Sequence, residues 1–144
     1  MKDKKIIGYT TGVFDLFHIG HLNILKNAKS MCDELIVGVT TDELTEKRKN
    51  KKPIIPFDER VAIVESIKYV DKVVPQTEID EIKDQELLGF NLICKGGDWK
   101  GTEKWNKLEA EFEKIGVSVY FFPYTENTSS TLIREVLYKE VEKK

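Results

Sequence analysis

Short apolar runs that end at turn residues alternate along this chain with segments of helical periodicity. Strands and helices in this alternating order form a parallel sheet covered by helices. The apolar runs predict strands over residues 5–10, 34–40, 69–74, 91–94 and 117–122. The helical pattern predicts helices over residues 21–30, 60–67, 79–88, 105–115 and 129–140, and a short one starting at 42–44. We therefore expect an α/β fold with a doubly wound, mostly parallel open sheet of the Rossmann-like kind and helices on both faces.

The length of the chain indicates how many domains it forms, and its charge indicates which partners it attracts. With 144 residues, 40% of them hydrophobic, it can bury one sizeable core, so we expect a single domain over residues 1–144. The 23 basic and 25 acidic residues give a formal net charge of -2, which attracts neither nucleic acid nor an anionic membrane. Any anion site must therefore be local.

Targeting and redox signals are sparse in the sequence. The N-terminus lacks the apolar core of a signal peptide, and no apolar run is long enough to span a membrane. The only cysteines, Cys32 and Cys94, form no Cys-x-x-Cys pair. These features favour a cytoplasmic protein.

The turn after the first predicted strand is rich in groups that bind an anion. It reads Thr-Thr-Gly-Val-Phe-Asp-Leu-Phe-His-Ile-Gly-His over residues 10–21. It lacks both the Gly-x-Gly-x-x-Gly fingerprint of dinucleotide sites and the Lys-Ser/Thr ending of a P-loop. Gly12 lets backbone amides approach a phosphate, and the amides that begin the next helix face the same anion. The turn therefore predicts a phosphate-binding strand-loop-helix site.

Two histidines of this turn, His18 and His21, lie three residues apart. Gly20 between them has no Cβ, so a triphosphate can come close while both rings donate N–H bonds. Such donors, placed where charge builds as the bond between the α and β phosphates breaks, stabilise the transition state more than the bound substrate. The alternatives are a helix cap or surface role for each ring, and a zinc site, for which no third ligand lies nearby. We favour the triphosphate clamp and assign no metal ligand.

The sequence around the histidines resembles the His-x-Gly-His signature of the nucleotidyltransferase superfamily. Its Phe-Asp-x-x-His version resembles the cytidylyltransferase branch, in particular the small bacterial glycerol-3-phosphate cytidylyltransferases. The resemblance implies transfer of a cytidylyl group from CTP to a small phosphorylated alcohol, with Mg²⁺ accompanying the triphosphate, in a homodimer. It covers nearly the whole chain, through residues 41–44, the basic run at 47–52, and residues 56–60, 69–71, 97–99 and 125–131.

The resemblance also implies roles for individual residues. It puts His18 and His21 on the triphosphate, and none of the matched residues is a nucleophile. The attacking group is then the phosphate of the acceptor, so we expect in-line displacement at the α-phosphorus without a covalent enzyme intermediate. The residues implied to bind the nucleotide or to shape its loop are Thr10, Thr11, Gly12, Phe14, Asp15, Gly20, Arg60, Asp98, Thr125, Ser129 and Ser130.

The basic run over residues 47–52 matches a family segment that reaches the phosphates. Its cations can neutralise both the acceptor phosphate and the departing pyrophosphate, and Lys49 and Lys51 are our catalytic candidates. A one-residue insertion relative to the family leaves Arg48 and Lys52 as alternatives. We expect this run to form a loop, and a solvated surface role is the alternative for each lysine. A surface cation is likewise the alternative for Arg60.

Departures near the C-terminus bear on specificity. The family's Arg-Thr-Glu-Gly run reads Tyr-Thr-Glu-Asn over residues 124–127, so a cation expected at the nucleotide is missing. Ser129 and Ser130 match a helix start that contacts phosphates in the family, and an N-cap cluster is their plain structural alternative.

The sequence is consistent with more than one nucleotide and more than one acceptor. The Lys-Gly-Gly-Asp run over residues 95–98 resembles sugar-phosphate adenylyltransferases, which use ATP. Trp99 either stacks on a base or on the acceptor, or packs beneath a loop. Two alternatives to cytidylyl transfer therefore stand: adenylyl transfer from ATP, and a nucleotide-binding module without turnover.

Overall fold

Five parallel strands form one sheet in the computed structural model, which describes residues 5–122. The strand order is β3-β2-β1-β4-β5, and every neighbouring pair is parallel. The strands are β1 (Ile7–Gly12), β2 (Glu34–Thr40), β3 (Lys72–Gln76), β4 (Leu92–Gly96) and β5 (Ser118–Phe122). The helices of the described part are α1 (Ile19–Ser30), α2 (Asp42–Lys49), α3 (Phe57–Glu65), α4 (Glu81–Leu88) and α5 (Glu103–Lys114), with a 3-10 turn η1 (Gly97–Trp99).

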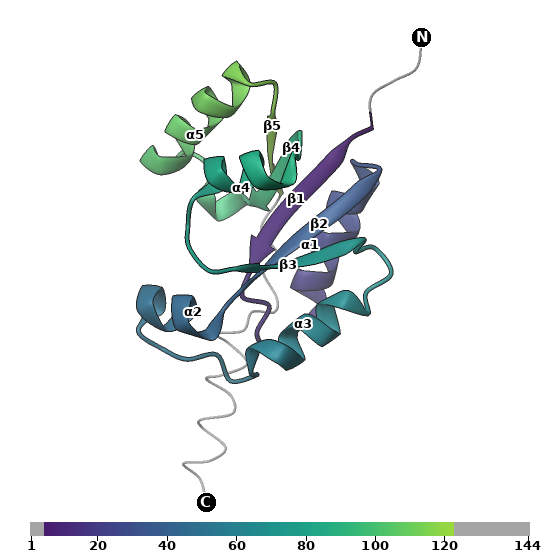
Figure 1. Ribbon diagram of the computed structural model, residues 1–144, viewed down its shortest axis with the longest axis vertical. Helices are drawn as coiled ribbons and strands as arrows, with labels where there is room; N and C mark the ends of the chain where they lie inside the picture. Colours follow the sequence, from purple (N-terminus) through teal and green to yellow (C-terminus); the bar gives the residue numbers. More distant parts are fainter. Residues whose placement is uncertain (1–4, 123–144) are drawn as a thin grey trace, which may run out of the picture.

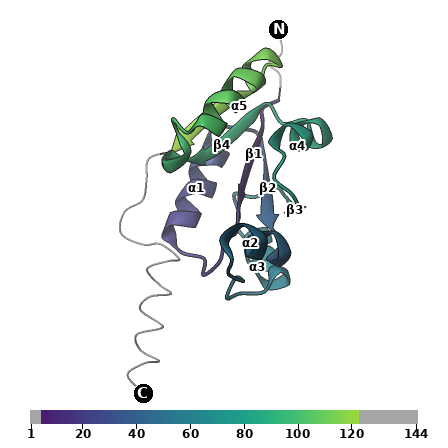
Figure 2. The same cartoon turned by 90° about the vertical axis from the view of Figure 1, so that its left-hand side faces the viewer.

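Helices cover both faces of the sheet, as Figures 1 and 2 show. Helices α1 and α3 pack on one face, against inward residues such as Val37 and Val39 of β2. Helices α4 and α5 cover the other face, where Ile36 of the same strand and Phe112 of α5 belong to one apolar cluster. Because β2 is covered on both faces, its sequence is a nearly continuous apolar run. The doubly wound fold predicted from the sequence is confirmed.

The direction of winding reverses between β1 and β4. From β1 the chain moves outward to β2 and β3, and it then returns to the other side of β1 with β4 and β5. The pairing of β1 with β4 covers only Gly8 with Leu92 and Tyr9 with Ile93, although the strands continue to Gly12 and Gly96. The sheet therefore opens at the carboxyl ends of these strands, which is where ligands bind in open α/β sheets.

Helix α2 is longer than the sequence predicts. The basic run was expected to form a loop, and this is wrong for residues 47–49, which belong to α2. The Thr41 side chain caps the start of the helix, acidic residues stand in its first turn, and its three basic residues complement the dipole of the last turn. The helix ends at Asn50, which takes the left-handed conformation with φ 57°.

Most of the other boundaries are shifted by one to three residues from the sequence prediction, and two of these shifts have a clear physical reason. Helix α1 begins at Ile19 instead of residue 21, because His18 supplies the cap. Strand β3 runs through Pro75, where the sequence prediction ended it, and an edge strand tolerates a proline. The helix predicted over residues 129–140 lies outside the described residues. Within residues 5–122, no helix is long and apolar enough to cross a membrane.

Candidate functional site

His18 and His21 cap the start of α1 through their own side chains. Nδ1 of His18 accepts a hydrogen bond from the Gly20 amide at 3.0 Å, and Nδ1 of His21 accepts one from the His18 amide at 3.2 Å. The two bonds form a reciprocal capping box, made here from two imidazoles. The rings stack with their centroids 4.0 Å apart. The capping role that we considered for these histidines is therefore present, and it uses one nitrogen of each ring.

This capping arrangement sets the protonation state of the histidine pair. A nitrogen that accepts a hydrogen bond carries no proton, so each neutral ring carries its proton on Nε2. Burial lowers the pKa of His18. Burial, and then the neighbouring His18, lowers the pKa of His21 to about 4, with Asp15 opposing and Lys49 adding to the shift. At neutral pH both rings are therefore uncharged N–H donors.

The loop between β1 and α1 is held in shape by buried side chains. Phe14 has φ 55°, a conformation that bulky residues rarely adopt, and its ring packs edge-on against His21 at 5.4 Å. The Asp15 carboxylate accepts hydrogen bonds from the amides of Ile54 and Ile55, each at 2.8 Å. A Cβ on Gly12 would lie 3.0 Å from the Phe14 ring, so this glycine makes room for the ring. Phe14 and Asp15 therefore shape the loop.

Arg60 is wholly buried, so the surface role considered for it is wrong. Its guanidinium donates to the carbonyl oxygens of Val13, Thr40 and Ile55, and it pairs with Asp42. These bonds join the loop after β1, the end of β2 and the start of α2 to helix α3. The donors of Arg60 thus serve the scaffold around the site, and its contact with a nucleotide stays a prediction.

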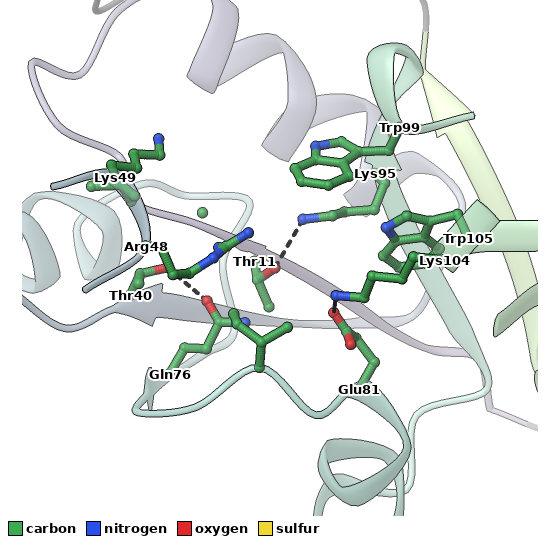
Figure 3. A pocket seen from close by; sticks show the side chains of 13 residues that line it. Thr11, Thr40, Arg48, Lys49, Gln76, Glu81, Lys95, Trp99, Lys104 and Trp105 are labelled. Carbon is green, nitrogen blue, oxygen red and sulfur yellow. Dashed lines mark hydrogen bonds and ion pairs between the residues drawn. The ribbon is translucent and has the colours of Figure 1, made fainter. Parts of the chain in front are cut away.

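A cavity of about 240 Å³ lies at the carboxyl ends of four adjacent strands. Figure 3 shows its lining side chains, with those of α2 on one side and those of β4, η1 and α5 on the other. The strand ends contribute Thr11 and Gly12 of β1, Thr40 of β2, Gln76 of β3 and Lys95 of β4.

The cavity is basic although the chain as a whole is not. Its charged lining residues are one carboxylate, Glu81, and the cations Arg48, Lys49, Lys95 and Lys104. Lys104 lies 3.2 Å from the Glu81 carboxylate, and Lys95 lies 3.3 Å from the Thr11 hydroxyl. The excess of cations makes this cavity suited to an anionic ligand.

The histidine pair and the cavity adjoin through the loop after β1. Gly12 and Val13 line the cavity, and His18 lies at the far end of the same loop. Lys49 lines the cavity, and its charge helps to lower the pKa of His21. The structure thus brings a neutral donor pair next to a basic cavity.

The other predicted site residues are distributed as follows. Lys51 lies exposed beyond the end of α2 and does not line the cavity, whereas its alternative Arg48 does. The Thr10 hydroxyl points into the sheet and donates to the Cys94 carbonyl at 2.9 Å. Gly20 is buried in the first turn of α1. The side chain of Asp98, together with Thr125, Ser129 and Ser130, lies outside the described part of the chain.

Sequence reasoning missed several residues of the cavity. Lys95 and Gln76 each stand at the carboxyl end of a strand, so their position in the alternating pattern was a usable signal. Glu81 and Lys104 lie near the starts of two different helices and meet only in the folded chain, so no local pattern marks them. Trp99, which we left between stacking and packing, is half-buried and lines the cavity.

Comparisons with known proteins identify a family and several relatives of this chain. The family model described as cytidylyltransferase-like matches residues 9–136. A glycerol-3-phosphate cytidylyltransferase of Bacillus subtilis is 37% identical over 134 residues, which cover 92% of this chain and 95% of that protein. An FAD synthase of Pyrococcus horikoshii is 49% identical over 126 residues, covering 85% of this chain and 83% of that protein. The solved structure of a lipopolysaccharide core biosynthesis protein from Thermoplasma volcanium matches with a TM-score of 0.71 and 32% identity. The match covers 85% of this chain and 100% of the chain in that structure.

Proposed function

The chain belongs to the cytidylyltransferase-like family and is a nucleotidyltransferase, and on that premise we propose that it joins a nucleoside triphosphate to a small phosphorylated acceptor. The observation that carries the proposal is the neutral pair His18 and His21, whose Nε2–H groups are left for a ligand beside a basic cavity. N–H donors of this kind suit a triphosphate, because they can donate hydrogen bonds to its oxygens where negative charge grows in the transition state.

The reaction we propose is a direct displacement. An oxygen of the acceptor phosphate attacks the α-phosphorus, the bond from that phosphorus to the bridging oxygen breaks, and pyrophosphate leaves with the bond electrons. Negative charge grows on the bridging oxygen as this happens. The Nε2–H groups of His18 and His21 donate to the phosphates there, and the cation of Lys49 offsets the growing charge.

Magnesium is part of the proposal as a companion of the triphosphate. Within residues 5–122 no three His, Cys, Asp or Glu side chains are grouped to hold a metal ion. Mg²⁺ commonly keeps few protein ligands and binds to the substrate phosphates, so this site is compatible with Mg²⁺ that arrives on the nucleotide. There it would neutralise phosphate charge.

The first nucleotide and acceptor to test are CTP and glycerol 3-phosphate. Relatives named glycerol-3-phosphate cytidylyltransferase, at 35% to 37% identity over most of the chain, support this pair. Adenylyl transfer is the second candidate. The FAD synthase relative at 49% identity supports it, because the name of its product implies an adenylyl group joined to a flavin phosphate. Both candidates use a phosphate ester as the acceptor.

A substrate matrix tests the proposal. The protein is incubated with Mg²⁺ and either CTP or ATP, together with glycerol 3-phosphate, a heptose phosphate or flavin mononucleotide, and pyrophosphate release is measured. We expect release that depends on one nucleotide and one acceptor being present together. Triphosphate binding without release for any pair would contradict nucleotidyl transfer.

We also propose that the protein is a homodimer. Sedimentation equilibrium tests this, and we expect a mass twice that of the chain.

A further inference from the structure

The indole nitrogen of Trp105 is a buried donor without a partner among the described residues. Trp105 is 0% exposed and stands in the first turn of α5, where its backbone amide donates to Thr102. Its Nε1–H, in contrast, makes no hydrogen bond. A buried unpaired N–H is destabilising, and native proteins keep few of them. Such a group calls for a ligand that completes it.

This donor belongs to the wall of the basic cavity. Trp105 lines the cavity, and Figure 3 shows the nitrogen edge of its ring turned toward the side chains of Lys95 and Lys104. The Lys95 ammonium lies 5.8 Å from the centroid of the Trp105 ring and 5.1 Å from that of Trp99. Lys95 thus lies within cation–π distance of both indoles on this wall. A ligand that reaches the Trp105 nitrogen therefore also meets the Lys95 ammonium.

The chemistry of the wall indicates which ligand it fits. An indole N–H can only donate, and it stands with two ammonium groups, so the matching group is an anionic oxygen. The carboxylate of Glu81, whose side chain is 7% exposed, pairs with Lys104 on the same wall. A carboxylate only accepts hydrogen bonds, so it matches a hydroxyl. The combination fits a phosphate ester that also carries free hydroxyl groups.

We propose that Trp105 donates its Nε1–H to an oxygen of a phosphorylated polyol acceptor, held by Lys95 and Lys104 with its hydroxyls toward Glu81. Trp105 is then a specificity-determining residue for the acceptor. This inference rests on the proposed nucleotidyl transfer and names its acceptor class. The inference predicts that the NMR signal of the Trp105 indole proton shifts when the acceptor binds.

Nuclear magnetic resonance tests the inference on the intact protein. The chain has two tryptophans, so its nitrogen-proton spectrum has two indole signals, and the Trp99→Phe variant assigns them. Glycerol 3-phosphate, flavin mononucleotide, CTP and ATP are titrated separately. We expect at least one of the two phosphate esters to move the Trp105 indole proton downfield. A Trp105 signal that stays still with both esters, or moves only with a nucleoside triphosphate, would overturn the inference.

A pair of variants adds a kinetic test. Trp105→Phe keeps an aromatic ring but removes the donor, and Phe112→Leu trims a fully buried ring on the same helix without touching the cavity. Losing a hydrogen bond to a charged group should raise the acceptor KM roughly tenfold or more in Trp105→Phe, with the nucleotide KM little changed. In Phe112→Leu the acceptor KM should stay within about twofold of wild type.

The kinetic and spectroscopic results distinguish the role proposed for Trp105 from the proposed nucleotidyl transfer. If Trp105→Phe leaves the acceptor KM unchanged while the enzyme turns over, the inference fails and nucleotidyl transfer stands. If the indole signal responds to an ester but no nucleotide pair releases pyrophosphate, nucleotidyl transfer fails and the acceptor site stands. Should Trp105→Phe not fold, as judged by its thermal unfolding, the titration of the wild-type protein decides.

Discussion

Among single residues, the histidine pair has a structural task, the capping of α1, and the chemical task that we propose for it. One nitrogen of each ring accepts a backbone amide and caps α1, which directs the proton to the other nitrogen. Burial and the proximity of the second ring then keep His21 uncharged, with its pKa lowered to about 4. Because the cap and the donor are different atoms, a suitable substitution can remove the donor and keep the cap.

A substitution at His18 separates these two tasks. Asparagine is a good N-cap but has no group that reaches as far as Nε2, so His18→Asn should keep the stability of the helix start and lose the donor. We expect kcat to fall roughly 10²- to 10³-fold in His18→Asn and in His18→Ala alike. Only His18→Ala should also lose about 1 kcal/mol of unfolding free energy. Near-normal turnover in His18→Asn would refute the clamp.

The pKa of His21 predicts a pH dependence of stability. Its folded pKa of about 4 lies below the ordinary value of 6.5, so between these pH values the unfolded chain binds a proton that the folded chain does not. The unfolding free energy should therefore fall as the pH drops from 6.5 towards 4, by on the order of 3 kcal/mol from this group. The lowered pKa of His18 acts in the same direction.

Urea unfolding at several pH values, with His21→Leu as the reference, isolates this contribution. Subtracting the variant's stability curve from that of the wild type removes the titration of all other groups that the substitution leaves unchanged. We expect the wild type to lose unfolding free energy relative to His21→Leu as the pH falls from 6.5 to 4. A difference that stays constant over this range would contradict the lowered pKa of His21.

At the scale of elements, α2 carries cations to the cavity and α3 holds α2 in place. Arg48 and Lys49 stand in the last turn of α2, and Asp42 in its first turn pairs with Arg60 of α3. The sequence prediction treated the basic run as a loop because cations in series are typical of solvated segments. Three cations in the last turn of a short helix are nevertheless stabilising, because they interact favourably with the negative end of the helix dipole.

Arg60 should therefore matter for stability and, through α2, for activity. Arg60→Met removes four hydrogen bonds, which reach three carbonyl oxygens and Oδ1 of Asp42, and leaves the Asp42 carboxylate only the amide of Phe57 as a donor among the described residues. We expect a loss of about 3 kcal/mol in unfolding free energy, measured by urea unfolding. Lys68→Met, which removes an exposed cation, should change stability by about 0.5 kcal/mol or less. Equal losses in both variants would show that the bonds of Arg60 contribute nothing.

At the scale of the whole molecule, the fold was readable because its signals are periodic and local. Strand β2 has the predicted bounds, since a wholly apolar run between polar ends has one interpretation. The position of the site was readable too, because a parallel sheet collects its ligands at the carboxyl ends of its strands. The turn over residues 10–21 lies at that edge, as predicted, and its binding of a phosphate stays a prediction.

The remaining features depend on contacts that no sequence window contains. Lys104 and Glu81 are 23 residues apart and meet in the cavity. Arg60 is buried among partners at residues 13, 40, 42 and 55, most of them distant in sequence, whereas a cation at a helix start is usually solvated. The missing hydrogen bond of Trp105 is likewise a property of packing, since a tryptophan in an amphipathic helix reads simply as core.

The proposed function requires that this site transfer the nucleotidyl group itself. The most direct test follows two radioactive labels, one in the α-phosphate and one in the γ-phosphate of the nucleotide that the substrate matrix selects. We predict that the α-label appears in the acceptor product and the γ-label in pyrophosphate. The γ-label on the acceptor, or an α-label that appears only in hydrolysed nucleotide, would contradict the claim.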